Sequence, residues 1–272
     1  MGTSVEAVEA YLERTADERL DDYLEFLRIP TIGSLSEHAD DMARGADWIA
    51  RQMRHIGLEH VDISPTGGNP VVYADWLHAD SAPTVVVYAH YDVQPVDPLD
   101  LWVRPPFEPR VEDGRVYARG AADDKGQVHL HLWAAKAWLA THGGLPVNVR
   151  YVFEGEEEDG SPNFEAWLRT NTERLSGDLI VVSDTGFYEG NHPALTVSLR
   201  GNTYFQYYVT APSQDLHSLS FGCMVQNPAN DILRILASLR DGEGRITVTG
   251  LYDEAPHLRE AERAQFARLP FD

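Results

Sequence analysis

The chain has 272 residues, 43% of them hydrophobic, and a formal net charge of −21. This length can bury a sizeable core in one large domain or two smaller ones. The absence of an apolar run of membrane-spanning length and the acidic N-terminal segment, unlike a signal peptide, predict a soluble cytoplasmic protein with no membrane partner. The negative charge repels phosphate backbones and argues against nucleic-acid binding. The single cysteine, Cys223, excludes an internal disulfide.

Hydrophobic periodicity predicts alternating helices and strands over residues 1–200. In chain order, the predicted elements are helices at 4–29 and 40–55, strands at 71–76 and 84–89, a helix at 125–141, a strand at 147–153, a helix at 163–174 and a strand at 179–183. The proline-rich segment 91–109 is predicted to be a long ordered loop. This alternation indicates an α/β fold with a mostly parallel sheet covered by helices.

The pattern changes after Gly201. Aromatic and β-branched residues predict strands at 204–209 and 245–249, and an amphipathic segment with proline in its first turn predicts a helix at 227–239. We therefore predict two domains, residues 1–200 and residues 201–272, joined through a hinge at Leu199–Asn202. The second is expected to be a smaller α+β unit.

Acidic and imidazole side chains follow the ends of β-rich segments. They are His90, Asp92, Asp123, Asp124, Glu157, Glu158 and Asp184. Strand ends in an α/β protein converge on the crevice outside the sheet, so these side chains are expected to lie close together. Carboxylates gathered in this way repel one another unless a cation lies among them. The sequence therefore predicts a metal site.

Each of these motifs has a plainer interpretation when taken alone. His90-x-Asp92 could be a surface pair, Asp123-Asp124 could cap a helix, and the acidic run 154–159 could be a solvated loop. Their repetition at successive strand ends favours the metal site. Within the acidic run, one carboxylate can bind a metal while its neighbour carries a proton, which is the division of labour that metal-activated hydrolysis requires.

In order and spacing, four of these motifs resemble a known enzyme family. They are His90-x-Asp92, the segment Arg119–Gly126, the pair Glu157-Glu158, and Asp184. The family is that of two-metal zinc peptidases, which includes carnosinase-like dipeptidases, aminoacylases, glutamate carboxypeptidases and succinyl-diaminopimelate desuccinylases. The resemblance covers nearly the whole chain and is closest to the dipeptidase branch. It implies a catalytic domain at 1–200 and part of an α+β lid and dimerisation domain at 201–272.

The resemblance implies that two divalent metal ions bind at this site, zinc in the first place, with manganese or cobalt as alternatives. Asp123 is expected to bridge both ions. His90 and Asp184 are expected to bind one ion, and Glu158 the other.

The implied reaction is hydrolysis of the amide bond of a dipeptide or a small N-acyl amino acid. By resemblance, Glu157 is expected to act as general base toward the bridging water, and Asp92 is expected to orient His90. The family also implies a cis peptide bond between Asp123 and Asp124.

His217 resembles a lid histidine that reaches the active site of a partner subunit and stabilises the oxyanion there. This implies a homodimer that forms through residues 201–272. Leu219 stands where the family usually has glycine, which alters the backbone freedom of this loop. The alternative for His217 is an ordinary residue of a surface loop.

The family's fifth ligand is a histidine near the end of a longer chain, and no residue here matches it. The late histidines His192 and His257 lack the expected surroundings. The sequence therefore predicts a chain truncated within the lid, and we expect the missing C-terminal half to be supplied as a separate chain. It leaves two hypotheses open: a metal-dependent hydrolase, and a catalytically inactive remnant that serves as a metal-binding or interaction module.

Overall fold

The computed structural model describes residues 5–188, 192–196, 198–210, 212–253 and 257–270. The chain divides into two units, residues 1–186 and residues 187–272. The domain boundaries proposed from the sequence, 1–200 and 201–272, remain a prediction. No helix within the described ranges combines the length and the apolar character needed to cross a membrane.

The first unit is built on a five-stranded sheet with the strand order β1-β2-β6-β3-β7. These strands are β1 (Glu59–Ser64), β2 (Val71–Trp76), β3 (Thr84–His90), β6 (Asn148–Glu154) and β7 (Leu179–Val182). Strand β3 pairs in parallel with β6 and β7, whereas β2 pairs antiparallel with β1 and β6. Among these strands, β2 is therefore antiparallel to the other four. The predicted mostly parallel α/β fold is confirmed.

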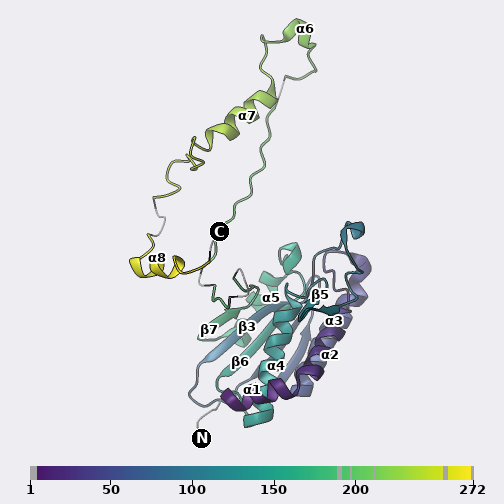
Figure 1. Ribbon diagram of the computed structural model, residues 1–272. Coiled ribbons are helices and arrows are strands. Elements are labelled where there is room, and N and C mark those ends of the chain that lie inside the picture. The colour runs from purple at the N-terminus through teal and green to yellow at the C-terminus, as the bar shows by residue number, and fades with distance from the viewer. Residues whose placement is uncertain (1–4, 189–191, 197, 211, 254–256, 271–272) are drawn as a thin grey trace. The chain divides into compact units, whose positions relative to one another are not determined.

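Helices cover both faces of this sheet. They are α1 (Val5–Arg14), α2 (Ala16–Leu27), α3 (Ala39–Ile56), α4 (Lys125–His142) and α5 (Phe164–Thr170). Alternate residues of a strand point to opposite faces, so Val72 and Ala74 pack in the cluster that includes buried side chains of α2, α3 and α4. Val71 and Tyr73 pack instead against Trp167 of α5. Figure 1 shows α2, α3 and α4 side by side along the sheet.

Helix α3 shows how the sequence sets one of these elements. Its buried residues, among them Met42, Ile49 and Met53, recur at helical spacing and face the core. Gly57 ends the helix at φ +93°, a left-handed conformation that glycine adopts without steric cost, and its N–H bonds to the carbonyl of Arg54. The ring of Trp48 stacks on Phe26 of α2 at 4.4 Å between centroids and joins the two helices.

Most elements of the first unit match the predicted ranges. The predicted helix at 4–29 consists of α1 and α2, and the predicted helix at 163–174 consists of α5 and the 3-10 helix η4 (Thr172–Leu175). The loop at 91–109 contains only the 3-10 helix η2 (Leu99–Leu101). Strand β1 and the hairpin of β4 (Arg110–Glu112) and β5 (Arg115–Tyr117) were not predicted. The remaining 3-10 helices of this unit are η1 (Ser36–His38) and η3 (Glu157–Asp159).

The second unit contains three helices in its described part, α6 (Ser218–Phe221), α7 (Pro228–Ser238) and α8 (Glu260–Phe266). Helix α7 confirms the helix predicted at 227–239. Asn227 caps it, because its side chain accepts the N–H of Ala229 at 2.9 Å. The strands predicted at 204–209 and 245–249 are absent from the described part of this unit. A strand requires a hydrogen-bonded neighbour, and the second segment forms only the isolated bridge between Arg240 and Ile246.

Candidate metal centre

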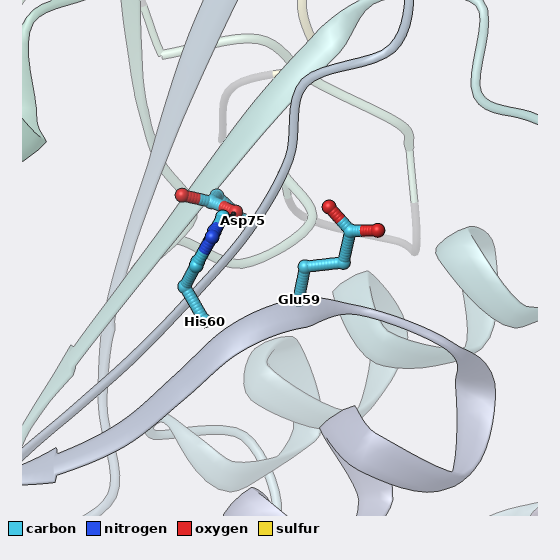
Figure 2. A group of neighbouring side chains, drawn as sticks. All are labelled: Glu59, His60 and Asp75. Atoms are coloured by element: carbon cyan, nitrogen blue, oxygen red, sulfur yellow. Dashed lines mark hydrogen bonds and ion pairs between the residues drawn. The ribbon is translucent and has the colours of Figure 1, made fainter.

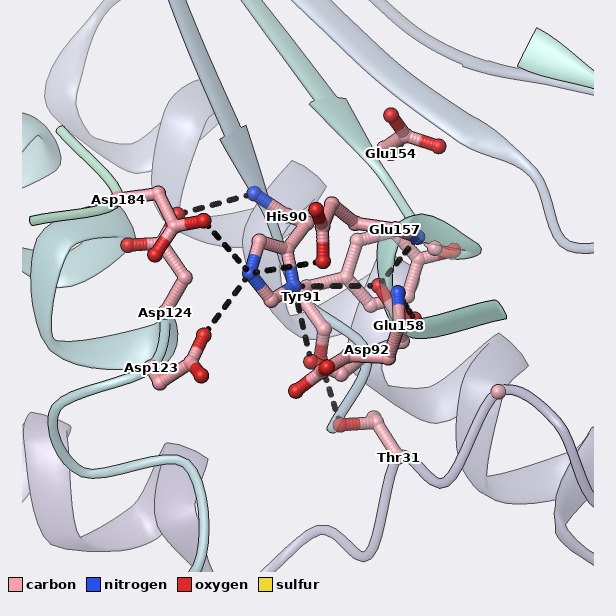
Figure 3. A network of polar contacts seen from close by, with 12 residues as sticks. Thr31, His90, Tyr91, Asp92, Asp123, Asp124, Glu154, Glu157, Glu158 and Asp184 are labelled. Atoms are coloured by element: carbon pink, nitrogen blue, oxygen red, sulfur yellow. Dashed lines mark hydrogen bonds and ion pairs between the residues drawn. The ribbon is translucent and has the colours of Figure 1, made fainter. Parts of the chain in front are cut away.

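His90 lies at the end of β3 with its side chain fully buried. Strand β3 is flanked by the parallel strands β6 and β7, so the carboxyl ends of three strands meet around this residue. The sequence therefore places the acidic residues that follow these strands at one edge of the sheet. Figure 3 shows their carboxylates arranged around the His90 ring.

The Nε2 atom of His90 faces three carboxylates from different parts of the chain. It lies 3.1 Å from Oδ1 of Asp123, which precedes α4. It lies 3.9 Å from Oε2 of Glu157 in η3, and 3.9 Å from Oδ2 of Asp184, which follows β7. Ligand atoms of His90, Glu157 and Asp184 lie within 4.8 Å of one another, the spacing of groups that can hold one ion.

The other ring nitrogen of His90 is held by Asp92. Nδ1 lies 3.1 Å from the carbonyl oxygen of Asp92 and 3.3 Å from its carboxylate Oδ1. A histidine that binds metal through one nitrogen commonly has its other nitrogen fixed by an oxygen in this way. The contact predicted between Asp92 and His90 is thus present in the structure.

Glu158 points its carboxylate toward Gln94. The amide of Gln94 donates to Oε2 of Glu158 at 2.7 Å and to its carbonyl oxygen at 3.1 Å. Burial raises the pKa of Glu158, the hydrogen bond from Gln94 lowers it, and the charge of Asp123 raises it further. Glu158 is therefore close enough to Asp123 for the two charges to interact, although Glu157 is the residue grouped with His90 and Asp184.

The peptide bond between Asp123 and Asp124 is cis, as the family resemblance implied. Asp124 is fully buried, and its Oδ2 accepts the backbone N–H of His90 at 3.1 Å. Burial raises the pKa of Asp124 to about 7, partly offset by the contact with His90. Its other carboxylate oxygen has no hydrogen-bond partner among the described residues. Asp123 and Asp124 thus face different sides of this turn, one toward the ring of His90 and one toward its backbone.

The ionisation of these groups reflects an excess of negative charge. Burial alone would lower the pKa of His90, but the hydrogen bond and charge of Asp92, with the charges of Asp124 and Glu157, raise it to about 10. Burial also raises the pKa of Glu157, and the charges of Asp184 and Glu158 add to the effect. A cation among these carboxylates would relieve their repulsion. One imidazole with several carboxylates is a donor set that suits zinc, manganese or cobalt.

The structure adds a residue that was not predicted from the sequence. Glu154, opposite His90 in the β3–β6 ladder, is buried and accepts the hydroxyls of Tyr88 at 2.6 Å and Ser161 at 2.9 Å. These contacts hold both ends of the turn that carries Glu157. The signal available in the sequence was its position as the first acid of the 154–159 run, directly at the strand end.

His217 belongs to the second unit, where it caps the short helix α6. Its Nδ1 accepts the N–H of Leu219 at 3.1 Å, and both side chains are exposed. Leu219 takes part in this turn as a helical residue. The role of His217 toward a partner subunit remains a prediction.

Comparison with known proteins places this arrangement in a family. The chain is 31% identical to the beta-Ala-His dipeptidase of Rattus norvegicus over 283 aligned positions, which cover 99% of this chain and 58% of that protein. It superimposes on the structure of an M20 family metallo-carboxypeptidase from Sulfolobus solfataricus with a TM-score of 0.78 and 34% identity, over 94% of this chain and 57% of that one. Human carnosine dipeptidase 1 superimposes with a TM-score of 0.72 and 29% identity, over 100% of this chain and 60% of that one.

The chain thus spans about half the length of the curated relatives it matches. The model of peptidase family M20/M25/M40 matches residues 86–267, a range that begins within β3 and contains His90, Asp123, Glu157, Glu158 and Asp184. On this match the chain belongs to peptidase family M20/M25/M40.

Proposed function

We propose that this protein is a metal-dependent dipeptidase that hydrolyses the amide bond of dipeptides or small N-acyl amino acids. The observation that carries the proposal is the convergence of three carboxylates on Nε2 of His90, at 3.1 to 3.9 Å. Several relatives are dipeptidases by name, beta-Ala-His dipeptidase and Cys-Gly metallodipeptidase among them, which supports a dipeptide as the substrate class.

The residues would hold two divalent ions in the manner that the family resemblance implies. His90 and Asp184 would bind one ion, Glu158 the other, and Asp123 would bridge them. When bound, such a pair of ions supplies Lewis acidity for the amide carbonyl and for the attacking water. We propose zinc as the native metal, with manganese and cobalt as alternatives.

Glu157 would move the proton. Its side chain is 38% exposed, so a substrate and a water molecule can reach Oε2, which lies 3.9 Å from the imidazole of His90. Burial and neighbouring carboxylates raise the pKa of Glu157, which brings it toward the range useful for accepting and returning a proton near neutral pH. Oε2 would take a proton from water as its oxygen attacks the carbonyl carbon. The same proton would pass to the amide nitrogen as the C–N bond breaks.

Further features of the site are proposals of the same kind. We propose a homodimer formed through residues 201–272, in which His217 stabilises the oxyanion at the partner's site, and we propose a cytoplasmic location. We also propose that a separate chain supplies the histidine that serves as the fifth ligand in the family. Mass spectrometry of the purified protein tests this last point, because a companion polypeptide must co-purify if the idea holds.

Hydrolysis of a dipeptide panel in the presence of zinc, manganese or cobalt tests the activity. Glu157→Gln keeps the shape of the side chain but removes the base, so kcat should fall by about 10²- to 10⁴-fold. Metal content, measured by elemental analysis, should stay unchanged. Glu165→Gln, at an exposed position of α5, is the matched control. Full activity in the Glu157 variant would exclude it as the base, and no turnover by the wild-type protein with any metal would contradict the proposed function.

A further inference from the structure

A second group of metal-ligating side chains lies at the far edge of the sheet from β7, on strands β1 and β2. Glu59 and His60 begin β1, and Asp75 lies in β2. One ligand atom from each of these residues lies within 4.8 Å of the other two, the same relation found for His90 and its neighbours. Figure 2 shows the His60 ring directed at the Asp75 carboxylate, with the Glu59 carboxylate beside the pair.

The geometry of Asp75 is suited to a ligand. Its side chain is only 8% exposed, and its Oδ1 lies 2.7 Å from Nδ1 of His60. Its other oxygen, Oδ2, accepts the hydroxyl of Tyr73 at 2.9 Å. A metal-binding carboxylate is commonly held by a hydrogen bond to its second oxygen, which fixes the first. Asp75 is thus held in place before any ion arrives.

The carboxylate of Glu59 contacts a histidine outside the cluster. Nε2 of His78 lies 2.9 Å from Oε2 of Glu59, and the His78 ring packs edge-on against Trp76 at 5.2 Å. The Glu59 side chain is 48% exposed, so it can rotate toward the other two ligands. In a tetrahedral zinc site the ligand atoms lie about 3.3 Å apart, a spacing that this rotation can reach.

The backbone explains why two consecutive residues can face one carboxylate. In regular strands, neighbouring side chains point to opposite faces. Here Glu59 pairs with Asp75 and Asp62 pairs with Tyr73, so two residues of β1 lie opposite a single residue of β2. The backbone of His60 has φ +50° in this bulge. The bulge thereby directs the His60 side chain toward the side on which Asp75 lies.

Solvent reaches this cluster through the exposed side chains of His60 and Glu59, because the Asp75 side chain is nearly buried. His60 and Asp75 line a cavity of about 430 Å³ together with Arg150 and Arg174. The guanidinium of Arg174 stacks over Tyr73 at 4.1 Å and bonds to Asp62 at 3.1 Å. Arg150 donates to the carbonyl of Glu173 at 2.8 Å. Arg150 lies opposite Asp75 in the β2–β6 ladder, but among the described residues neither arginine forms an ion pair with Glu59 or Asp75.

We propose that Glu59, His60 and Asp75 form a peripheral site for one transition-metal ion of the zinc class, with water completing the coordination. One imidazole and two carboxylates match the ligand preferences of zinc and cobalt. The ion joins the edge strand β1 to β2 at the bulge, where the ladder is irregular. Its binding therefore stabilises this edge of the sheet independently of the centre at His90.

Zinc titration of the metal-free full chain by isothermal titration calorimetry tests the site. His60→Gln and Asp75→Asn should each bind one zinc equivalent fewer than the wild-type protein. The groups around His90 are intact in every variant, so the difference in stoichiometry reports only on the peripheral site. Equal stoichiometry in the wild type and His60→Gln would overturn the proposal. His60 is 70% exposed, so its substitution should leave the fold intact, and circular dichroism checks this.

His38→Gln is the matched control. Nδ1 of His38 lies 2.7 Å from Oδ2 of Asp41, the same separation as in the His60–Asp75 pair, but the other partner of Asp41 is Arg44 rather than a second acid. This variant should bind as much zinc as the wild type. A second readout is hydrogen exchange: saturating zinc should slow exchange of the β1 and β2 amides in the wild type and leave it unchanged in His60→Gln. Zinc-induced protection of equal size in both proteins would also refute the site.

Discussion

Oδ2 of Asp92 accepts the backbone N–H of Glu158 at 3.0 Å, although the two residues are 66 positions apart in the chain. Its other oxygen, Oδ1, lies 3.3 Å from the N–H of Glu157 and 3.3 Å from Nδ1 of His90. One buried carboxylate thus fixes both the end of β3 and the η3 turn. The relative position of the imidazole and the two glutamates depends on this contact.

We expect Asp92→Asn to weaken metal binding without removing a ligand. The amide nitrogen that replaces one carboxylate oxygen of Asp92 cannot accept hydrogen bonds. Either the η3 turn or the His90 ring therefore loses its anchor. Changes to groups that hold metal ligands typically lower metal affinity by about 10- to 100-fold. Competition with a chelator of known affinity measures the loss. Asp100→Asn, in the exposed η2 segment, should bind metal as the wild type does, and unchanged affinity in Asp92→Asn would show that the anchor is dispensable.

The sequence predicted the elements of the first unit where the hydrophobic pattern was long and continuous. Strands β2 and β3 and helix α4 match their predicted ranges within one residue. Strand β1 was missed because Glu59-His60-Val61-Asp62 is largely polar and lies at the sheet edge, where little of it is buried. The hairpin β4–β5 has strands of three residues each, too short for a periodic signal.

The location of the candidate metal centre followed from strand ends, but its finer geometry did not. Position along the chain could not decide which of Glu157 and Glu158 faces His90, because consecutive residues of a 3-10 turn point in directions about 120° apart. The cluster of Glu59, His60 and Asp75 was not predicted from the sequence for a related reason. It depends on a bulge in β1, and a bulge changes which residues share a face without leaving a mark in the hydrophobic pattern.

A substitution at Gly33 can disturb the site without changing any of its side chains. A Cβ atom at this position would lie 2.7 Å from the carbonyl oxygen of Gly155 and 3.0 Å from Cβ of Asp92. Gly33→Ala should therefore displace Asp92 and the start of the acidic turn. We expect a loss of about 1–3 kcal/mol in the free energy of unfolding together with weaker metal binding.

Urea unfolding and chelator competition on the same variant measure both effects. Gly242→Ala is the control, because a Cβ there meets no atom within 4 Å. If Gly33→Ala matched this control in both measurements, the close packing of Gly33 against Asp92 and Gly155 would have no energetic consequence.

Lys125, the first residue of α4, binds the chain at the end of α2. Its side chain is fully buried, and Nζ donates to the carbonyls of Phe26 at 3.1 Å and Ile29 at 2.6 Å. Lys125→Met keeps the length of the side chain but removes one of the two donors to each carbonyl, which leaves Phe26 with the N–H of Ile29 and Ile29 with the N–H of Thr31. Each lost hydrogen bond should cost about 0.5–1.5 kcal/mol. We expect the variant to be less stable in urea at pH 8. Burial lowers the pKa of Lys125 to about 7, so at this pH the native amine is largely neutral. Wild-type stability in this variant would mean that the two hydrogen bonds of Lys125 contribute no net stability.

His129 should make the protein sensitive to acid. It is buried in α4, its ring stacks on Tyr23 at 5.1 Å, and its Nε2 has no hydrogen-bond partner among the described residues. Burial, with the charges of Arg19 and Lys136, lowers the pKa of His129 to about 3, against about 6.5 in an unfolded chain. Between these values the unfolded state binds the additional proton. The stability that His129 contributes by staying neutral is therefore complete above about pH 6.5 and is lost as the pH falls toward 3.

We expect His129→Gln to flatten this dependence. Each pH unit within the window removes up to about 1.4 kcal/mol per histidine from the wild type, so between pH 6 and pH 5 the variant should lose roughly 1 kcal/mol less. Urea unfolding at both pH values measures the two differences, and any constant change in stability caused by the substitution cancels between them. His55→Gln, at an exposed position of α3, controls for the removal of a histidine as such. Parallel stability curves for the wild type and His129→Gln across this range would mean that His129 takes up its proton in the folded protein as readily as in the unfolded chain.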